Sequence, residues 1–387
     1  MKQWKTAVFG TGFMGRVHVE AISRLGNVEV AAIASLDGSN ARRLADQFSV
    51  QRVEGEYRKI LEDPSIDAVH ICAPNAQHYP MALAALEAGK HVVCEKPLAT
   101  TVDEARALVA AADKAGRRDC LNHNLRYYPL VQQIRQLREA GELGDILVAQ
   151  GSYSQDWLLY DTDYNWRVEE KDGGALRCMA DIGSHWFDML EHLTGQRVSS
   201  LCADLHTFHK TRKKPKRAVE TFAGKTLQPG DYDEVPITTD DYGGVVFRMG
   251  TAHGSMTASQ VSGGRKNRLT IEIYGTKGSA AWDQEKPNEL WLGYRNSNNQ
   301  IIVKDPSLLM PGAQSYADLP GGHGEGYGDT FKQVFRRFYA SLDKPDAKPE
   351  YPTFRDGLRQ LDIMQAEMES QKSRAWVGVP AHQEVKG

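Results

Sequence analysis

The fold of the first third of the chain is decided by residues 6–15, TAVFGTGFMG. The apolar run TAVF leads into three glycines spaced G-x-G-x-x-G, and a helical pattern follows. In a strand–turn–helix unit the first glycine permits a tight turn, the second lets a pyrophosphate approach the backbone, and the third lets helix and strand pack closely. The pattern therefore predicts a dinucleotide-binding turn, with a purely structural turn as the alternative. Its residues are Gly10, Gly12, Phe13, Met14 and Gly15.

Outward from this turn, strand and helix patterns alternate as far as residue 122. The expected strands cover residues 6–10, 28–35, 52–53, 68–74, 91–97 and 118–122. The expected helices cover residues 15–25, 39–48, 57–63, 78–88 and 101–115. Continuous apolar strands separated by helices are typical of a parallel sheet covered on both faces. The pattern predicts an α/β domain over residues 1–123, a doubly wound parallel sheet of the Rossmann type.

The strand pattern changes after about residue 146. Polar and apolar residues then alternate, as in VVFRMGTAHGSMTASQ (245–260), and a Gly-Thr-Lys-Gly turn stands at 275–278. Such alternation favours an open, mostly antiparallel sheet with one covered face. A helix that carries His185 and two closing helices, near 325–342 and 353–372, complete a second α/β domain, predicted over residues 124–387.

Residues 210–240 have the least regular pattern. They begin with the basic octamer KTRKKPKR and continue with Gly, Pro and Asp, including the acidic residues Asp231, Asp233 and Glu234. A basic octamer can mark nucleic-acid binding, but Pro215 interrupts it and the acidic residues balance its charge. The segment is therefore predicted to be a solvated insertion loop.

The composition limits the class of protein. With 387 residues, 41% of them apolar and 25% charged, the chain resembles a globular protein of two domains. A formal net charge of −3 supplies no general attraction to nucleic acid or anionic lipid. No run is long enough to span a bilayer, and the first residues lack the features of a secretion signal. The five cysteines are odd in number and include no Cys-x-x-Cys pair, which predicts reduced thiols in the cytoplasm.

The residue at the end of the second strand bears on the choice between NAD and NADP. A carboxylate about twenty residues after the glycine turn normally binds the ribose hydroxyls of NAD, but Ser35 stands at that place here. Asp37 lies close enough in sequence to take the ribose. Arg42 or Arg43 could meet a 2′-phosphate, although both could equally be exposed helix surface. Both cofactors therefore stay open.

Polar motifs follow the fourth and fifth strands, at the ends where open α/β sheets bind their ligands. They are Ala73-Pro74-Asn75-Ala76-Gln77-His78 and Glu95-Lys96-Pro97. Further along stand Asn124-x-Arg126-Tyr127 and Gly173-Gly174-(x)6-Asp181-x-Gly183-x-His185-x-x-Asp188. In this order, and over nearly the whole chain, these motifs resemble the Gfo/Idh/MocA family of oxidoreductases. The stretches 151–157 and Asn165-Trp166-Arg167 are also similar to the branch that contains levoglucosan dehydrogenase and enzymes that oxidise glycosides at C3.

The resemblance implies a catalytic set of Lys96, Asp181 and His185. Oxidation of a secondary alcohol needs a base for the hydroxyl proton as hydride leaves for the nicotinamide, and histidine titrates near neutrality. A lysine at the same oxygen would stabilise developing alkoxide charge. An aspartate four residues before a histidine shares a helix face with it, and could orient the imidazole or bind a neighbouring hydroxyl. The alternatives are an ordinary hydrogen-bonded histidine and an aspartate that caps a helix.

The resemblance also implies the residues around the cofactor and the substrate. Those expected at the cofactor, besides the glycine turn, are Ser35, Asp37, Pro74, Asn75, His78, Glu95, Lys96, Asn124 and Arg126. Arg126 could instead pin the domain junction, and Asp188 is a candidate structural partner. Candidate substrate contacts, whose aromatic members could stack on a pyranose or simply pack in the core, are Tyr127, Tyr153, Trp157, Trp166, Arg167 and His323. No metal-ligand spacing is visible.

One function is favoured over two alternatives. The chain is predicted to be an NAD- or NADP-dependent dehydrogenase that acts on a secondary alcohol of a sugar, glycoside or cyclic polyol. As the family implies, it is expected to form a homo-oligomer, a dimer or a tetramer. The alternatives are an NAD-dependent glycoside hydrolase of the same fold and a non-catalytic NAD(P)-binding sugar sensor, and the presence of both Lys96 and His185 argues against the sensor.

Overall fold

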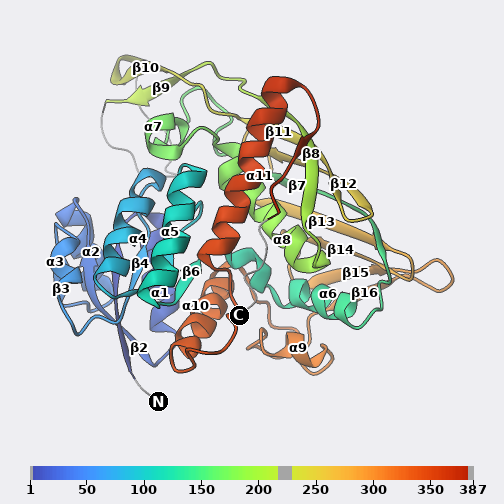
Figure 1. Cartoon of the computed structure of the whole chain (residues 1–387), viewed down its shortest axis with the longest axis horizontal. Coiled ribbons are helices and arrows are strands. Elements are labelled where there is room, and N and C mark those ends of the chain that lie inside the picture. The colour runs from blue at the N-terminus through green and yellow to red at the C-terminus, as the bar shows by residue number, and fades with distance from the viewer. Residues whose placement is uncertain (1–2, 217–228, 382–387) are drawn as a thin grey trace. The chain divides into compact units, whose positions relative to one another are not determined.

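The computed structural model of the chain describes residues 3–216 and 229–381 (Figure 1). The chain divides into two compact units. The first contains the N-terminal residues as far as Asn124, with Lys171–Gly174 and Tyr327–Leu361. The second contains Leu125–Glu170, Ala175–Gly326 and the residues from Asp362 onward. Each unit draws on distant parts of the sequence, and the boundary expected at residues 123 and 124 stays a prediction about folding domains.

The first unit is built on a six-stranded parallel sheet in the order β3-β2-β1-β4-β5-β6. Its strands are β1 Trp4–Phe9, β2 Val28–Ala34, β3 Arg52–Glu54, β4 Ala68–Ile71, β5 His91–Cys94 and β6 Asp119–Leu121. Its helices are α1 Phe13–Ser23, α2 Gly38–Gln47, α3 Arg58–Leu61, α4 His78–Glu87, α5 Val102–Ala115 and α10 Tyr327–Leu342. The strand order reverses between β1 and β4, so right-handed crossovers place the connecting helices on opposite faces. The prediction of a doubly wound Rossmann sheet is confirmed.

These strands form because apolar side chains lie on both faces of the sheet. The last three residues of β1 are fully buried, and so is every residue of β4. Helices cover such strands on both faces, and accordingly α1 packs against α10 and α4 packs against α5. The sheet thereby holds the carboxyl ends of β1, β4 and β5 as fixed supports for the loops that follow them.

The second unit is built on a nine-stranded sheet in the order β16-β15-β14-β13-β7-β12-β11-β8-β17. Its strands are β7 Ile146–Ser154, β8 Val198–His206, β11 Tyr242–Met249, β12 Ala252–Ser259, β13 Arg268–Gly275, β14 Ser279–Asp283, β15 Glu289–Gly293, β16 Gln300–Val303 and β17 Val377–Gly378. Neighbours pair antiparallel, except that β7 and β12 pair parallel. The expected turn at 275–278 joins β13 to β14, with Gly275 N–H donating to Gly278 O at 3.0 Å. The prediction of an open, mostly antiparallel sheet is confirmed.

Helices pack on this second sheet. α6 Pro129–Glu139 and α8 Ser184–Thr194 do so, α9 Pro311–Gln314 packs against α6, and α11 Phe354–Ser373 contributes residues to both units. α8 packs against β7 and β13, where Trp186 Nε1–H donates to Thr270 O. Every residue of α8 except His192 is buried. The start of α8, which carries His185, is therefore held firmly against the central strands.

Two strands lie within the segment predicted to be a solvated loop. They are β9 Thr211–Pro215 and β10 Tyr232–Pro236, which pair antiparallel. In this register Lys213 faces Glu234 and Lys214 faces Asp233, and opposite charges directly across a strand pair stabilise it. The loop prediction is wrong for these strands, because the basic run and the acidic residues that were expected in a solvated loop lie on two paired strands. Residues 217–228 of the predicted loop lie outside the described residues.

Candidate active site

The glycine turn joins β1 to α1 and has the shape of a phosphate site. Gly10 has φ 99°, and a Cβ there would lie 2.6 Å from Cys72 O, just after β4. A Cβ on Gly15 would lie 2.1 Å from Gly10 O, so only glycine lets α1 pack so closely on the turn. A Cβ on Gly12 would meet nothing within 4 Å, and no side chain caps α1. The uncapped helix N-terminus beside open space is the arrangement that binds phosphate. Two residues open α1: the half-exposed Phe13, and Met14.

The end of β2 carries the residues expected to recognise the ribose. Thr11 Oγ1 donates to Ser35 Oγ at 3.0 Å, which ties the end of β2 to the glycine turn. Asp37 caps α2 by accepting from Asn40 N–H at 3.1 Å and from Ser39 Oγ at 2.8 Å. The hydrogen bond from Asn40 N–H lowers the pKa of the Asp37 carboxyl. Asp37 therefore serves as a helix cap, whatever contact it makes with a ribose.

The two arginines of α2 have different partners. Arg43 Nη2 donates to Asn40 Oδ1 at 2.7 Å, and Asn40 Nδ2 donates to Thr11 O at 2.9 Å. Arg42 Nη2 instead donates to Val50 O at 3.1 Å. Arg43 thus belongs to the polar group at the end of β2, whereas Arg42 belongs to the surface of α2. The sequence could not separate these neighbours because they carry the same charge.

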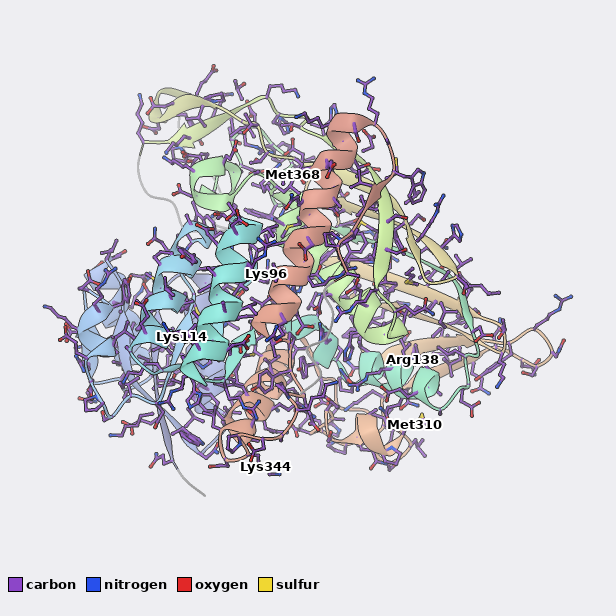
Figure 2. The ribbon with its side chains drawn as sticks, in the orientation of Figure 1. Lys96, Lys114, Arg138, Met310, Lys344 and Met368 are labelled. Carbon is purple, nitrogen blue, oxygen red and sulfur yellow. The ribbon has the colours of Figure 1, made fainter. Side chains whose placement is uncertain are left out.

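His78 joins the loops that follow β4 and β5. Its Nδ1 lies 2.6 Å from Pro97 O, and its Nε2 lies 2.9 Å from Ala73 O. Burial lowers the pKa of His78, so the ring is neutral at pH 7 and donates its single N–H to one of these carbonyls. The Lys96–Pro97 peptide is cis, and Lys96, which is labelled in Figure 2, is half-buried. His78 was predicted as a cofactor contact, and the contacts it makes here support the turn that carries Lys96.

Two predicted cofactor residues are engaged by other parts of the first unit. Asn75, which follows Pro74 at the end of β4, donates from Nδ2 to Gly173 O at 2.8 Å. Asn124 Nδ2 donates to Thr330 Oγ1 on α10 at 2.7 Å. Both amides are buried and each holds a segment distant in sequence. Their cofactor roles stay predictions.

Glu95, the first residue of the Glu95–Pro97 turn, is bound by polar residues that were not predicted from the sequence. Glu95 is buried and accepts from His18 Nε2 at 2.8 Å and from Asn122 Nδ2. His18 Nδ1 lies 2.9 Å from His70 Nδ1. A signal for this group was present, because each histidine interrupts an apolar run, His18 in a helix and His70 in a strand.

In the second unit, Asp181 and His185 lie where a π-helical turn meets α8. The π turn covers Met179–Gly183, and α8 follows it directly. Asp181 Oδ2 accepts from Gln260 Nε2 at 2.8 Å, and its Oδ1 lies 3.6 Å from Arg167 Nε. The side chain of His185 is buried, with 7% exposed. Asp181 and His185 were expected on one face if this segment were an ordinary helix, whereas the π turn that carries Asp181 is wider, a feature frequent at functional sites.

Aromatic rings and carboxamides gather beside His185. The ring of Tyr153, on β7, lies 6.4 Å from the imidazole of His185. Burial raises the pKa of Tyr153, so its hydroxyl stays protonated and donates to Asn267 Oδ1 at 2.7 Å. Gln155 Nε2 donates to the same oxygen at 2.8 Å, and Trp157 Nε1–H donates to Gln155 Oε1 at 2.8 Å. Amide groups that bond hydroxyls, next to aromatic faces that cover C–H groups, suit a polyhydroxylated ligand.

Arg167 links a second aromatic residue to Asp181. Its guanidinium carbon lies 4.4 Å from the ring centroid of Trp166, in cation–π geometry. Its Nη1 donates to Asn165 Oδ1 at 3.1 Å, while its Nε faces Asp181. The structure therefore connects five predicted site residues by contacts within the second unit, Trp166 and Arg167 with Asp181, and Tyr153 with His185.

Three further predicted site residues make other contacts in the second unit. Arg126 forms a two-pronged ion pair with Asp188, with Nε 2.6 Å from Oδ2. This pair fits the structural role expected for Asp188. Tyr127 is buried with its ring centroid 5.7 Å from that of Tyr316, as expected of a core aromatic residue, and His323 is exposed in a loop. The ligand contacts predicted for these three residues stay predictions.

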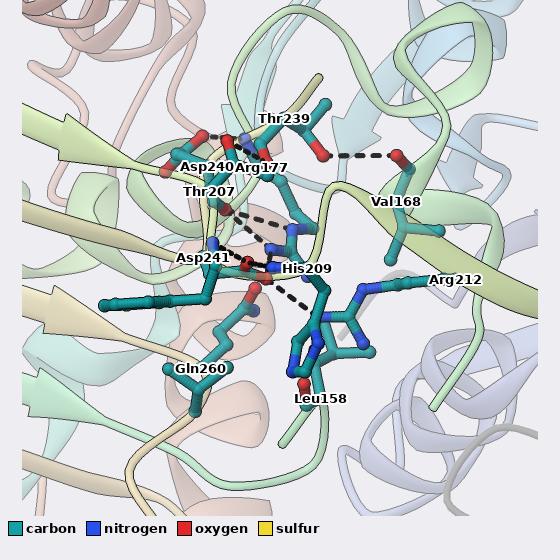
Figure 3. Close-up of polar contacts among 12 residues, drawn as sticks. Leu158, Val168, Arg177, Thr207, His209, Arg212, Thr239, Asp240, Asp241 and Gln260 are labelled. Atoms are coloured by element: carbon teal, nitrogen blue, oxygen red, sulfur yellow. Dashed lines mark hydrogen bonds and ion pairs between the residues drawn. The ribbon is translucent and has the colours of Figure 1, made fainter. Parts of the chain in front are cut away.

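Arg177, Arg212 and Asp241 form a fully buried charge cluster (Figure 3). Asp241 Oδ1 accepts from both Arg177 and Arg212, and its Oδ2 accepts from two backbone N–H groups. Burial opposes ionisation of Asp241, but the arginines and backbone donors keep its pKa below the ordinary value. Asp241 O also accepts from Gln260 N–H at 3.1 Å, and the Gln260 side chain binds Asp181. One residue therefore separates the cluster from the candidate catalytic carboxylate.

Arg212 connects this cluster to the segment that follows Trp157. Its Nη1 donates to Tyr160 O and Asp163 O, each at 2.9 Å, and its Nη2 donates to Leu158 O at 3.0 Å. Three backbone carbonyls of one irregular segment are thus fixed by one guanidinium. Arg212 was predicted to lie in a solvated loop, so its hydrogen bonds to these carbonyls were not expected.

Among residues 3–216 and 229–381, no three or more His, Cys, Asp or Glu side chains are grouped to hold a metal ion. In the same described part of the chain, no helix combines the length and apolar character needed to cross a bilayer.

The fold and the glycine turn define a Rossmann-type nucleotide-binding protein with a second α/β unit that presents an aspartate and a histidine. Two family profiles match the chain. They are "Oxidoreductase family, NAD-binding Rossmann fold" over residues 4–123 and "GFO/IDH/MocA C-terminal domain" over residues 131–281. The chain belongs to the Gfo/Idh/MocA family of NAD-binding oxidoreductases.

Characterised relatives are similar over nearly the full length. Levoglucosan dehydrogenase of Pseudarthrobacter phenanthrenivorans is 30% identical, over 98% of this chain and 99% of the relative. Glucose-6-phosphate 3-dehydrogenase of Bacillus subtilis is 25% identical, over 97% and 95% respectively. The solved structure of levoglucosan dehydrogenase in complex with NADH and levoglucosan superposes with a TM-score of 0.88 at 28% identity, covering 98% of this chain and 100% of that one.

Proposed function

We propose that the chain is an NAD- or NADP-dependent dehydrogenase that removes hydride from a secondary alcohol of an uncharged sugar, glycoside or cyclic polyol. The observation that carries this proposal is the group of Asp181, His185 and Tyr153 with carboxamides around them, in a chain whose other unit has the glycine turn. Full-length similarity to a dehydrogenase named for an anhydrosugar supports it.

Each candidate residue has a distinct role in this proposal. The nicotinamide, when bound, accepts the hydride from the carbinol carbon. His185 accepts the hydroxyl proton as the hydride departs. Lys96 stabilises the negative charge that develops on the same oxygen. Asp181, held by Gln260 and Arg167, accepts a hydrogen bond from a neighbouring substrate hydroxyl or orients His185.

The choice of cofactor depends on the end of β2. Ser35 carries no negative charge that would repel a 2′-phosphate, and Arg43 is joined to the same polar group through Asn40. Asp37 offers a carboxylate two residues further on. This arrangement supports use of both NAD and NADP, and the ratio of kcat/KM for the two cofactors measures the preference.

The charges of the second unit favour an uncharged substrate over a sugar phosphate. Next to Asn267 in sequence, Lys266 pairs with Asp156 at 2.6 Å and Arg268 pairs with Asp283 at 2.7 Å. Arg167 faces Asp181. A phosphate ester would have to displace one of these carboxylates, at an electrostatic cost. We therefore expect glucose, its anhydro form or an inositol to be oxidised in preference to glucose 6-phosphate.

One experiment tests the function and its alternatives. The protein is incubated with NAD or NADP and a panel of sugars, glycosides and inositols, while reduced cofactor is followed by absorbance and free sugar by chromatography. Accumulation of reduced cofactor supports the dehydrogenase. Release of sugar from a glycoside without reduced cofactor indicates the hydrolase, and saturable binding without either product indicates the sensor.

Assembly and location are part of the same proposal. Exposed apolar residues stand on strands of the nine-stranded sheet, among them Leu147, Val148, Val246, Ile301 and Val303, which supports a homo-oligomer, a dimer or a tetramer. All five cysteines are free thiols, which supports a reducing, cytoplasmic location. Light scattering in solution measures the assembly, and fractionation of cells measures the location.

A further inference from the structure

Four buried side chains of the first unit, from three elements and the turn after β5, form one hydrogen-bonded chain. Tyr339 Oη, on α10, lies 2.9 Å from His70 Nε2 on β4. His70 Nδ1 lies 2.9 Å from Nδ1 of His18 on α1, and His18 Nε2 lies 2.8 Å from Glu95 Oε1, directly after β5. Both histidines are fully buried, and Glu95 is 5% exposed. Polar groups withdrawn from water in this way are costly unless each finds partners.

The direction of the last bond follows from the charge of Glu95. Burial opposes that charge, but hydrogen bonds from His18 and Asn122 together with the charge of Lys96 outweigh it, so the pKa of Glu95 lies below its ordinary value. An ionised carboxylate only accepts hydrogen bonds, and therefore His18 Nε2 carries the proton. Burial also lowers the pKa of His70, which keeps that ring neutral and able to exchange one hydrogen bond with His18.

The chain reaches both parts of the nucleotide-handling apparatus. His18 stands three residues after Gly15, on the helix that starts at the glycine turn. Glu95 directly precedes Lys96 and the cis bond to Pro97. The contact from His18 to Glu95 is thus a direct link between the first turns of α1 and the turn that carries the candidate catalytic lysine.

We propose that His18 is a positioning residue of the oxidoreductase reaction, which holds Glu95 as a carboxylate and thereby fixes the Glu95–Pro97 turn and the place of Lys96. His70 and Tyr339 hold the ring of His18 in the orientation that this contact needs. The inference rests on the proposed function for the role of Lys96, but the link between His18 and Glu95 is testable without it.

Other ionisable groups also interact with Glu95. Besides His18 they are Cys72 after β4, His78 on α4, Cys94 and Lys96 beside it, and Cys120 on β6. Burial raises the pKa of the three thiols and lowers the pKa of His78, so these four are uncharged near neutral pH. Loss of His18 would therefore leave Asn122 and Lys96 to hold the carboxylate against burial.

The test compares His18→Leu, His18→Gln and the double variant His18→Leu/Glu95→Gln. Leucine removes the donor, so Glu95 binds a proton near neutral pH. We expect kcat/KM for the sugar to fall about tenfold or more at pH 6 and to recover largely by pH 9. Glutamine keeps an N–H near the position of Nε2 and should restore most of the wild-type pH profile. In the double variant the amide cannot ionise, so the recovery at high pH should disappear.

A second readout does not need the substrate. In His18→Leu the pKa of Glu95 is higher in the folded protein than in the unfolded chain. The free energy of unfolding therefore falls as the pH rises from the pKa of Glu95 in the unfolded chain to its pKa in the folded variant. The double variant should lose this slope, and urea unfolding between pH 5 and pH 8 measures both. A merely structural histidine would lower stability equally at every pH. Such a pH-independent loss overturns the link to Glu95, and a stability slope with an unchanged rate profile overturns the positioning role. If the wild type oxidises no sugar, the proposed function and the positioning role both fail, while the stability slope still decides the link.

Discussion

Replacement of Arg212 by methionine is the sharpest test of the second unit, because sequence and structure place this residue in opposite surroundings. The basic octamer predicts a solvated side chain whose removal is harmless. In the structure the guanidinium is fully buried, pairs with Asp241 at 2.7 Å and donates to three backbone carbonyls of residues 158–163. Methionine has a similar length, but it carries no charge and no donor.

The expected loss of stability follows from these contacts. Removal of one partner of a buried ion pair costs about 3–5 kcal/mol. Asp241 keeps Arg177 and two backbone N–H groups, which moderates that cost, while three carbonyls lose a donor at about 1 kcal/mol each. We expect Arg212→Met to lose about 4 kcal/mol, which corresponds to a fall in Tm of roughly 10 °C for a unit of this size.

Urea and thermal unfolding, followed by tryptophan fluorescence and near-ultraviolet circular dichroism, measure this loss. The matched control is Lys213→Met, the next residue, whose exposed ammonium pairs with Asp161 at 2.9 Å; its stability should stay close to that of the wild type. Arg212→Lys should recover little, because a compact ammonium cannot bond a carboxylate and three carbonyls at once. If Arg212→Met and Lys213→Met unfold at the same urea concentration, Arg212 is solvated and the anchoring of residues 158–163 is refuted.

Four further substitutions test the proposed chemistry and the electrostatics of the first unit. His185→Ala should lower kcat about a hundredfold or more and leave cofactor affinity nearly unchanged; an unchanged kcat would show that another group is the base. Lys96→Met should lower kcat in a way that excess substrate does not repair, since negative charge on the hydroxyl oxygen being oxidised develops only as the hydride leaves the carbinol carbon. Weak cofactor binding with a normal single-turnover rate would assign Lys96 to the cofactor instead. Ser35→Asp should raise the preference for NAD over NADP, and an unaltered ratio of kcat/KM would show that this strand end does not contact the ribose. Burial raises the pKa of Asp119 to about 6, so its pKa in the folded protein exceeds that in the unfolded chain. The free energy of unfolding therefore falls by up to about 3 kcal/mol as the pH rises from about 4 to about 6. Asp119→Asn should flatten that decline in urea titrations.

The architecture of both units could be predicted because it depends on patterns that extend over many residues. The strand order of the first unit follows from buried strands such as β4 alternating with helices, and the antiparallel sheet of the second follows from the alternation along strands such as β11. The parallel pairing of β7 with β12 could not be predicted, because β7 also pairs with β13 and no local pattern tells which neighbour a central strand takes. Long-range pairing is decided by the packing of the whole sheet.

Single polar residues were predicted less well than the motifs. Asp37 was predicted to bind the ribose, and that role stays a prediction; the structure adds that its carboxylate caps α2, which the residue type alone does not show. Arg212 was predicted to be solvated, because a strand as short as β9 has too few residues for the sequence to show which of its faces is buried. Asp181 was expected on one face with His185 if the segment were an ordinary helix, but it lies on a wider π turn. A single turn is too short for its sequence to show a periodicity that would reveal the extra residue.

The candidate reacting groups and the residues that support them differ in burial for a physical reason. Lys96 and Asp181, the candidate reacting groups, are half-buried, since a group that must meet a ligand has to stay accessible to it. The groups that aim them, Glu95 and Asp241, are buried and have several hydrogen-bond donors each. A charge removed from water is stable only when hydrogen bonds satisfy it fully. The same hydrogen bonds hold the neighbouring side chain in one orientation. His18 is a polar residue that interrupts an apolar run next to a motif. Such a residue is expected to be buried, and burial is tolerated only when it has a hydrogen-bond partner. Residues of this kind are therefore the first candidates for supporting a catalytic group.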